Sequence, residues 1–158
     1  MRPPLVIAGN YANAAVAREL AAQAGAGGVR LRVHVGVTDA EIARLYAGAR
    51  AFVYAPEREP FGLAVLEAIA AALPVVAVAE GGVEESVIPG RTGLLVPRDE
   101  QAFARALGRV LADDALARSL GNEARAVVER DWTWEAAADR VEHALARAAG
   151  RVPAESAI

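Results

Sequence analysis

Two glutamates separated by seven residues, Glu59 and Glu67, form the pattern in this chain that is best suited to chemistry. Pro60 and Gly62 lie between them and place Glu59 on a loop, and apolar residues then recur at helical spacing over residues 63–73. Glu67 is therefore expected about one turn inside a helix, where it is the only charged residue between positions 62 and 73. Because an unpartnered buried carboxylate is costly, Glu67 must be exposed or have a partner.

The residues around this pair predict a site for an anion flanked by hydroxyl groups. Residues 51–54, Ala-Phe-Val-Tyr, read as a strand, so a strand leads through a glycine-containing loop into a helix. Free backbone N–H groups at such a helix N-terminus can face an anion. The two carboxylates would then accept hydrogen bonds from neighbouring hydroxyl groups. A nucleotide sugar has both phosphate and hydroxyl groups and suits this site.

Strand and helix patterns alternate along the rest of the chain. Strands are expected at residues 5–8, 30–35, 51–54, 75–78 and 94–96, the first of them buried, and helices at 13–24, 38–49, 62–73, 99–111, 114–130 and 133–149, with a helical turn at 83–87. Thr38 and Glu41 fit a capping box, and Thr133 fits an N-cap. This alternation predicts the α/β class, with a Rossmann-like doubly wound parallel sheet and C-terminal helices. Ligands of such sheets bind beyond the carboxyl ends of the strands.

The segment around the glutamate pair resembles the donor-binding motif of retaining glycosyltransferases of the GT-B fold, especially glycosyltransferase family four. The likeness continues, in the family's order, through the strand at 73–78, Gly81-Gly82 followed by Glu85, the strand at 92–96 and Asp-Trp-Thr-Trp at 131–134. The resemblance covers most of residues 5–149. It implies that residues 1–150 are the C-terminal, donor-binding half of a GT-B fold, followed by a disordered tail at 151–158.

The resemblance also implies roles for individual residues. Glu59 is expected to contact the transferred sugar and is the catalytic candidate, and Glu67 is expected to bind the ribose hydroxyls. The other predicted substrate-binding residues lie on loops that follow strands: Phe61, Gly62, Leu63, Gly81, Gly82, Gly36 and Val37. Among these, the N–H groups at the helix start would meet the phosphate, the double glycine would pass the donor sugar, and Gly36-Val37 would approach the nucleobase. The Phe61 ring itself is expected to be structural.

The chain departs from the family pattern in two places. Glu84 stands where the family commonly has a proline, and Glu85 stays open between a helix cap and a ligand contact. The domain's first strand and helix, which usually supply a Gly-Arg turn and a lysine to the donor diphosphate, have no match here. The chain therefore resembles part of a hexosyltransferase-type enzyme that is inactive without its N-terminal GT-B domain.

Two other functions share these features. A sugar-nucleotide epimerase has the same architecture and the same donor, although the glutamate pair and Trp134 favour a transferase. A stand-alone nucleotide-binding module without catalysis is the second alternative. The resemblance implies no cofactor and no required metal, and no Asp-x-Asp pair occurs.

Composition excludes several other classes. A net charge of −3 without a basic stripe gives no reason to expect nucleic-acid binding. The chain has no cysteine, so disulfides and thiol chemistry are excluded, and all 17 of its basic residues are arginines. No apolar run approaches the roughly 18 residues of a transmembrane segment, and the N-terminal apolar stretch is too short for a secretory signal, so a cytoplasmic location is expected. Trp132 and Trp134 are expected to be packing anchors.

Overall fold

The computed structural model describes residues 3–11 and 13–150, so the tail predicted at 151–158 lies outside the described residues. The chain forms two compact units, Met1–Arg50 and Ala51–Ile158.

The first unit is a β-α-β-α segment. It consists of β1 (Leu5–Gly9), α1 (Ala14–Ala26), β2 (Leu31–Val35) and α2 (Asp39–Gly48). The two strands pair in parallel, with Leu5 opposite Leu31 and Gly9 opposite Val35. The predicted capping box starts α2, because Thr38 N–H donates to Glu41 Oε2 at 2.7 Å and Glu41 N–H donates to Thr38 Oγ1 at 3.3 Å.

The strand predicted at residues 5–8 is present, but the expectation that it is buried is wrong. Leu5 and Val6 are each 37% exposed, and none of the described residues of the first unit is buried. The physical reason is the small size of this layer: a sheet of two strands has two edges and little interior.

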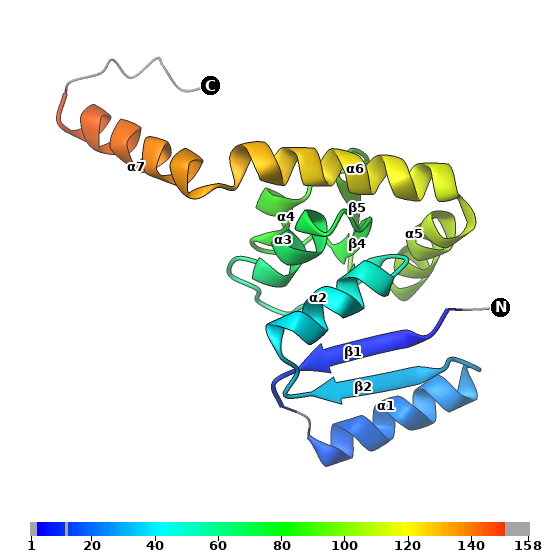
Figure 1. The fold of residues 1–158 in the computed structure, drawn as a ribbon. Coiled ribbons are helices and arrows are strands. Elements are labelled where there is room, and N and C mark those ends of the chain that lie inside the picture. The colour runs from blue at the N-terminus through cyan, green and yellow to red at the C-terminus, as the bar shows by residue number, and fades with distance from the viewer. Residues whose placement is uncertain (1–2, 12, 151–158) are drawn as a thin grey trace. The chain divides into compact units, whose positions relative to one another are not determined.

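The second unit holds a three-stranded parallel sheet in the order β3-β4-β5. Its first part alternates strand and helix: β3 (Phe52–Tyr54), α3 (Leu63–Ala70), β4 (Val75–Val78), α4 (Val83–Ser86) and β5 (Gly93–Val96). Three helices follow: α5 (Glu100–Ala112), α6 (Asp114–Asp131) and α7 (Trp134–Ala148) (Figure 1). Because strands alternate with helices and all pairings in both sheets are parallel, the predicted α/β class is confirmed.

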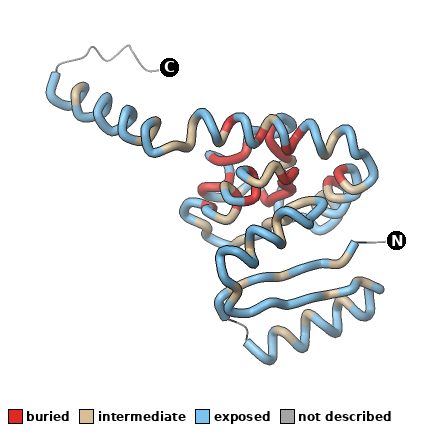
Figure 2. The backbone as a smooth tube through the Cα atoms, in the orientation of Figure 1, coloured by how far each residue is buried: buried red, intermediate tan, exposed pale blue. Residues whose placement is uncertain are grey.

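The core of the second unit surrounds its central strand. All four residues of β4 are buried, and Val76 packs in a cluster with Val110 of α5 and Leu120 of α6. Figure 2 shows the buried residues gathered in this unit, over α3, β4, α4 and the adjoining part of α6. This packing makes β4 and the elements beside it a rigid platform for the loops that follow the strands of this sheet.

Side-chain caps divide the C-terminal helices at the places that the sequence predicts. Asp99, Asp113 and Thr133 cap α5, α6 and α7, each through a side-chain oxygen that accepts from a backbone N–H. Trp132 is partly buried as expected, but the prediction that Trp134 anchors packing is wrong, since Trp134 is 89% exposed. It occupies the first turn of α7, a helix in which no described residue is buried.

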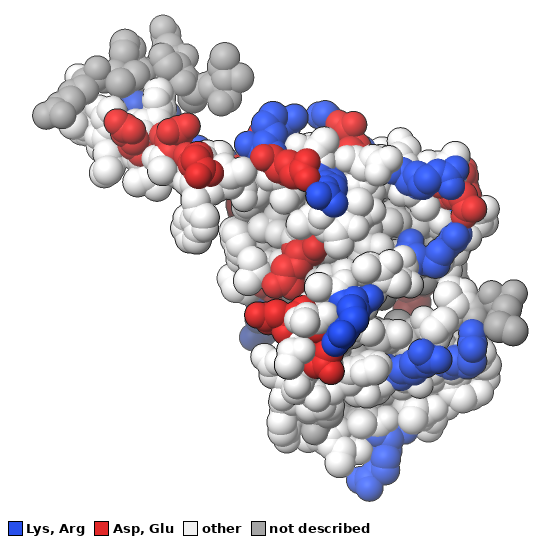
Figure 3. All heavy atoms as spheres, viewed as in Figure 1, with Lys and Arg blue, Asp and Glu red and all other residues white. Residues whose placement is uncertain are grey.

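The described surface is mixed in charge. Figure 3 shows acidic and basic side chains interspersed on the visible face. None of the described helices combines the length and the apolar character that crossing a membrane requires.

Candidate functional site

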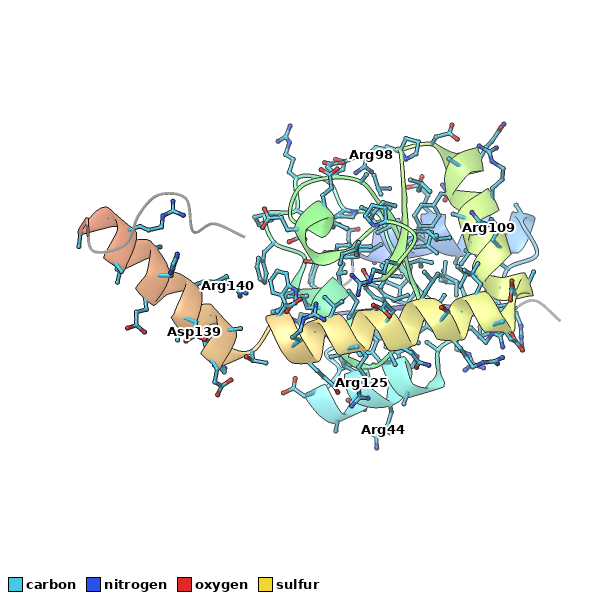
Figure 4. All side chains as sticks on the ribbon, turned by 90° about the horizontal axis from the view of Figure 1, so that it is seen from above. Arg44, Arg98, Arg109, Arg125, Asp139 and Arg140 are labelled. Atoms are coloured by element: carbon cyan, nitrogen blue, oxygen red, sulfur yellow. The ribbon has the colours of Figure 1, made fainter. Side chains whose placement is uncertain are left out.

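Three loops of the second unit follow the carboxyl ends of β3, β4 and β5. They carry Glu59, Glu80 with the Gly81-Gly82 turn, and Arg98, respectively. Because the three strands are parallel, these loops leave the sheet at one edge, which is where ligands of parallel α/β sheets bind. Figure 4 labels Arg98 beside the green loops of this unit.

The Glu59 carboxylate accepts three hydrogen bonds, one from a side-chain hydroxyl and two from backbone N–H groups. Its Oε2 accepts from the Tyr54 hydroxyl at 2.7 Å, and its Oε1 accepts from the N–H groups of Gly62 at 2.9 Å and Phe61 at 3.2 Å. The bond from Tyr54, followed by those from Gly62 and Phe61, lowers the pKa of the Glu59 carboxyl. Glu59 is therefore an anionic acceptor in a fixed orientation.

The bonds to Glu59 change one expectation about the start of α3. The sequence predicts unpaired N–H groups around Gly62, but those of Phe61 and Gly62 both donate to Glu59. Gly62, at φ 82°, is the N-cap of α3, and no side chain forms a capping bond there. The Glu59 carboxylate instead fixes the two residues that lead into the helix, Phe61 and Gly62. The N–H of Leu63, the first helical residue, has no acceptor among the described residues.

Tyr54 is the partner of Glu59 that sequence reasoning missed. Burial, and then the hydrogen bond to Glu59, raise the pKa of Tyr54 to about 12. Its hydroxyl therefore remains a donor at neutral pH. The missed signal was its place as the last residue of β3, five residues before Glu59.

The Gly81-Gly82 turn lies directly against the Glu59 loop. Gly82 N–H donates to the Glu59 carbonyl at 3.1 Å. A Cβ on Gly81, whose φ is 59°, would lie 2.1 Å from that carbonyl oxygen, and a Cβ on Gly82 would lie 2.4 Å from Phe61 Cα. Neither position has room for a side chain, so the contact of these two loops itself requires the glycines.

Glu67 lies on the exposed side of α3, one turn after Leu63. The opposite side of the helix buries Val65, Ala68 and Ile69. A carboxylate on the exposed side is accessible to a ligand, and Leu63, which is 61% exposed, precedes it by four residues on the same face. The structure thus brings together Glu59, Gly62, Gly81 and Gly82 and carries Glu67 on the helix that starts there.

The Phe61 ring and the pair Gly36-Val37 have other surroundings. The Phe61 ring is 46% exposed and contacts Trp132 edge-on, with ring centroids 5.8 Å apart. Gly36, at φ 65°, makes the turn after β2, where its N–H donates to the Gly9 carbonyl at 2.9 Å. Gly36 and Val37 belong to the first unit, so their predicted role at the nucleobase stays a prediction.

Sequence reasoning also missed an ion pair at this edge of the sheet. Glu80, two residues after β4, pairs with Arg98, two residues after β5. No cluster of three or more His, Asp or Glu side chains suited to a metal ion occurs in the part of the chain that the structure describes.

Comparison with known proteins gives a family match over most of the chain. Residues 2–127 match the family described as Glycosyl transferases group 1. D-inositol 3-phosphate glycosyltransferase of Xylanimonas cellulosilytica is 37% identical over 153 residues, which are 95% of this chain and 36% of the relative. Glycogen synthase of Mycobacterium tuberculosis is 40% identical over 99 residues, which are 62% of this chain and 24% of the relative. The chain thus spans 36% or less of the length of these relatives.

Solved structures agree with this match. Sucrose-phosphate synthase from Thermosynechococcus elongatus superposes with a TM-score of 0.73 at 32% identity, over 93% of this chain and 39% of that one. The C-terminal domain of a glycosyl transferase group 1 family protein (LpcC) from Francisella tularensis has a TM-score of 0.68 at 25% identity, over 77% of this chain and 64% of that one. Anabaena HepE in complex with UDP and glucose has a TM-score of 0.76 at 23% identity, over 91% of this chain and 40% of that one, which speaks for the fold alone. The predicted resemblance to the C-terminal domain of GT-B glycosyltransferases is confirmed.

Proposed function

The chain belongs to the group 1 glycosyl transferases, and from this membership we propose that it is the donor-binding domain of a retaining glycosyltransferase that uses a nucleoside-diphosphate sugar. The observation that carries the proposal is the Glu59 loop. This loop leads into the N-terminus of α3 and packs onto the Gly81-Gly82 turn. There a fixed anionic acceptor lies beside the start of a helix.

In this proposal the donor diphosphate lies at the N-terminus of α3. The helix dipole and the N–H of Leu63 favour negative charge at that point. The chain has no lysine, so the remaining phosphate charge must be met by arginine or by groups outside this chain. Glu67, on the exposed side of the same helix, accepts hydrogen bonds from the ribose hydroxyls.

The proposed role of Glu59 follows from its unused hydrogen-bonding capacity. Each carboxylate oxygen can accept about two hydrogen bonds. Oε1 already accepts two, from Gly62 and Phe61, whereas Oε2 accepts one, from Tyr54. Oε2 can therefore take a hydroxyl of the transferred sugar. Because its pKa is lowered, the Glu59 carboxyl is an anion. It therefore binds and orients the transferred sugar and does not donate a proton to it.

A nucleotide titration with one conservative variant tests the proposal. Glu67→Gln keeps the size of the side chain but removes the charge that the ribose hydroxyls would meet. Hydrogen bonds to charged groups contribute about 1.5–3 kcal/mol, so the Kd for uridine diphosphate should rise about tenfold or more. The matched control is Glu142→Gln, another exposed glutamate on a helix of the second unit, which should leave the Kd unchanged.

Two results of this titration would contradict the proposed role of Glu67. An unchanged Kd in folded Glu67→Gln would remove Glu67 from the site. A large loss of thermal stability in that variant, with no effect on the Kd, would give Glu67 a structural role instead.

A further inference from the structure

One carboxylate and one guanidinium connect the three loops at the carboxyl edge of the β3-β4-β5 sheet. Glu80 Oε1 accepts from the backbone N–H of Arg58 at 2.9 Å, and its Oε2 accepts from Arg98 Nε at 3.2 Å and also from Arg98 Nη2. Arg98 Nη2 donates in addition to the carbonyl of Pro56. The backbone that leads into Glu59 is thus held at two points, once by each member of the pair.

This backbone needs to be held. Arg58, which directly precedes Glu59, has a φ of 55°, a left-handed conformation that is unfavourable for a non-glycine residue. In that conformation the backbone N–H of Arg58 donates to Glu80. If Arg58 relaxed to an ordinary φ, the chain direction at Glu59 would change, and with it the reach of the carboxylate to Tyr54 and Gly62.

The exposure of the pair shows which role its bonds can have. The side chains of Glu80 and Arg98 are 34% and 44% exposed. Ion pairs this exposed contribute little to the free energy of unfolding. Two bonds to the backbone of one loop, in contrast, restrict that loop directly.

We propose that Glu80 and Arg98 are positioning residues that fix the loop of residues 56–59, and so hold the Glu59 carboxylate in place for the donor sugar. The second half of this inference rests on the proposed function, whereas the first half concerns the protein alone. The bond from the Arg58 N–H, followed by that from Arg98, lowers the pKa of Glu80, which keeps it charged at neutral pH.

The test compares three variants of the 158-residue chain. Glu80→Gln removes the charge from one side of the pair, and Arg98→Ala removes the guanidinium from the other. Glu123→Gln is the control, because Glu123 forms a similarly exposed pair with Arg91 that does not contact this loop. Circular dichroism establishes that each variant is folded.

The first measurement is the pH dependence of the Gly62 amide resonance by NMR, which reports ionisation of the carboxylate that this amide contacts. In the unaltered chain and in Glu123→Gln, the midpoint should lie below the usual range for glutamate. In Glu80→Gln and Arg98→Ala it should move up toward that range, since a released Glu59 loses its donors. An unchanged Gly62 midpoint in both variants would overturn the proposal.

The second measurement is the Kd for uridine diphosphate glucose. We expect Glu80→Gln and Arg98→Ala to raise it roughly three- to tenfold, the effect of one weakened hydrogen bond, and Glu123→Gln to leave it unchanged. A shifted Gly62 midpoint with an unchanged Kd would overturn the role toward the donor. If the unaltered chain does not bind the nucleotide sugar, the proposed function fails for this donor, and the Gly62 midpoint still decides whether the pair holds the loop.

Discussion

At the scale of single residues, Glu59 serves the protein and the proposed ligand together. The pattern of two glutamates predicts a ligand contact, and the structure adds that the Glu59 carboxylate accepts from Tyr54 and from the N–H groups of Phe61 and Gly62, which lead into α3. These two tasks are compatible because a carboxylate has more acceptor sites than these three bonds use. The same bonds fix the side chain before any ligand arrives, so little conformational entropy remains to be lost on binding.

Tyr54 provides a prediction about alkaline stability. Its pKa is about 12 in the folded protein and 10.0 without the fold, so the folded state retains the phenol proton more strongly. The resulting stabilisation is fully present below about pH 10 and is lost as the pH rises to about 12. Lysine and cysteine do not occur in this chain and cannot obscure this range.

We expect the free energy of unfolding, measured with urea, to fall from pH 10 to 12 in the unaltered chain. The fall should be clearly smaller in Tyr54→Phe. Tyr11→Phe serves as the control, because Tyr11 is 83% exposed, and it should behave as the unaltered chain does. Parallel pH curves for all three proteins would contradict a raised pKa of Tyr54 in the folded protein.

At the scale of helices and strands, the sequence was sufficient to predict every strand and helix that the structure describes, with ends displaced by up to about three residues. The reason is that periodicity, capping residues and glycines act locally, as at Thr38 and Glu41. What could not be predicted depends on contacts between distant segments. The Arg58–Glu80 bond spans 22 residues and the Glu80–Arg98 pair spans 18, and only the folded sheet brings them together.

The same distinction explains the errors at the site. The glycine pair was predicted to pass the donor sugar, and this stays a prediction. The sequence could not reveal that the backbone of Glu59 and Phe61 lies directly against these glycines. Trp134 has the large aromatic side chain that is typical of a packing anchor, but its burial depends on which residues pack against α7. Nothing among the described residues buries it.

Two helical glycines give a prediction about packing. A Cβ on Gly121 of α6 would lie 2.1 Å from the carbonyl oxygen of Ala72, whereas a Cβ on Gly108 of α5 would meet nothing within 4 Å. Gly108→Ala should raise the free energy of unfolding by about 0.5–1 kcal/mol through helix propensity. Gly121→Ala should lower it by about 1–3 kcal/mol, because overpacking outweighs the same gain.

Thermal or urea unfolding of the two variants checks this prediction. Since both change glycine to alanine within a helix, the difference between them isolates the contact of α6 with the turn at Ala72. Equal effects of the two substitutions would mean that α6 does not pack closely against this turn.

At the scale of the whole molecule, the second unit contains a well-packed core and the edge of the sheet that carries the candidate site. In the first unit, none of the described residues is buried, although its strands and helices are regular. The family match extends across both units, from residue 2 to residue 127. The nucleobase contacts predicted for Gly36 and Val37 stay a prediction, because these residues belong to the first unit.

The last prediction concerns activity. The chain spans 36% of the inositol phosphate glycosyltransferase that it resembles, and the proposed site meets donor phosphate with one helix N-terminus and no lysine. We therefore expect the 158-residue chain to bind a nucleoside diphosphate weakly and to transfer no sugar by itself.

The assay is a search for glycosylated product with a panel of nucleotide sugars and acceptors. Transfer should appear only when an N-terminal GT-B domain is supplied, and the product should retain the anomeric configuration of the donor. Efficient transfer by the isolated chain would refute its role as a donor-binding half, and an epimerised sugar nucleotide as the sole product would favour an epimerase.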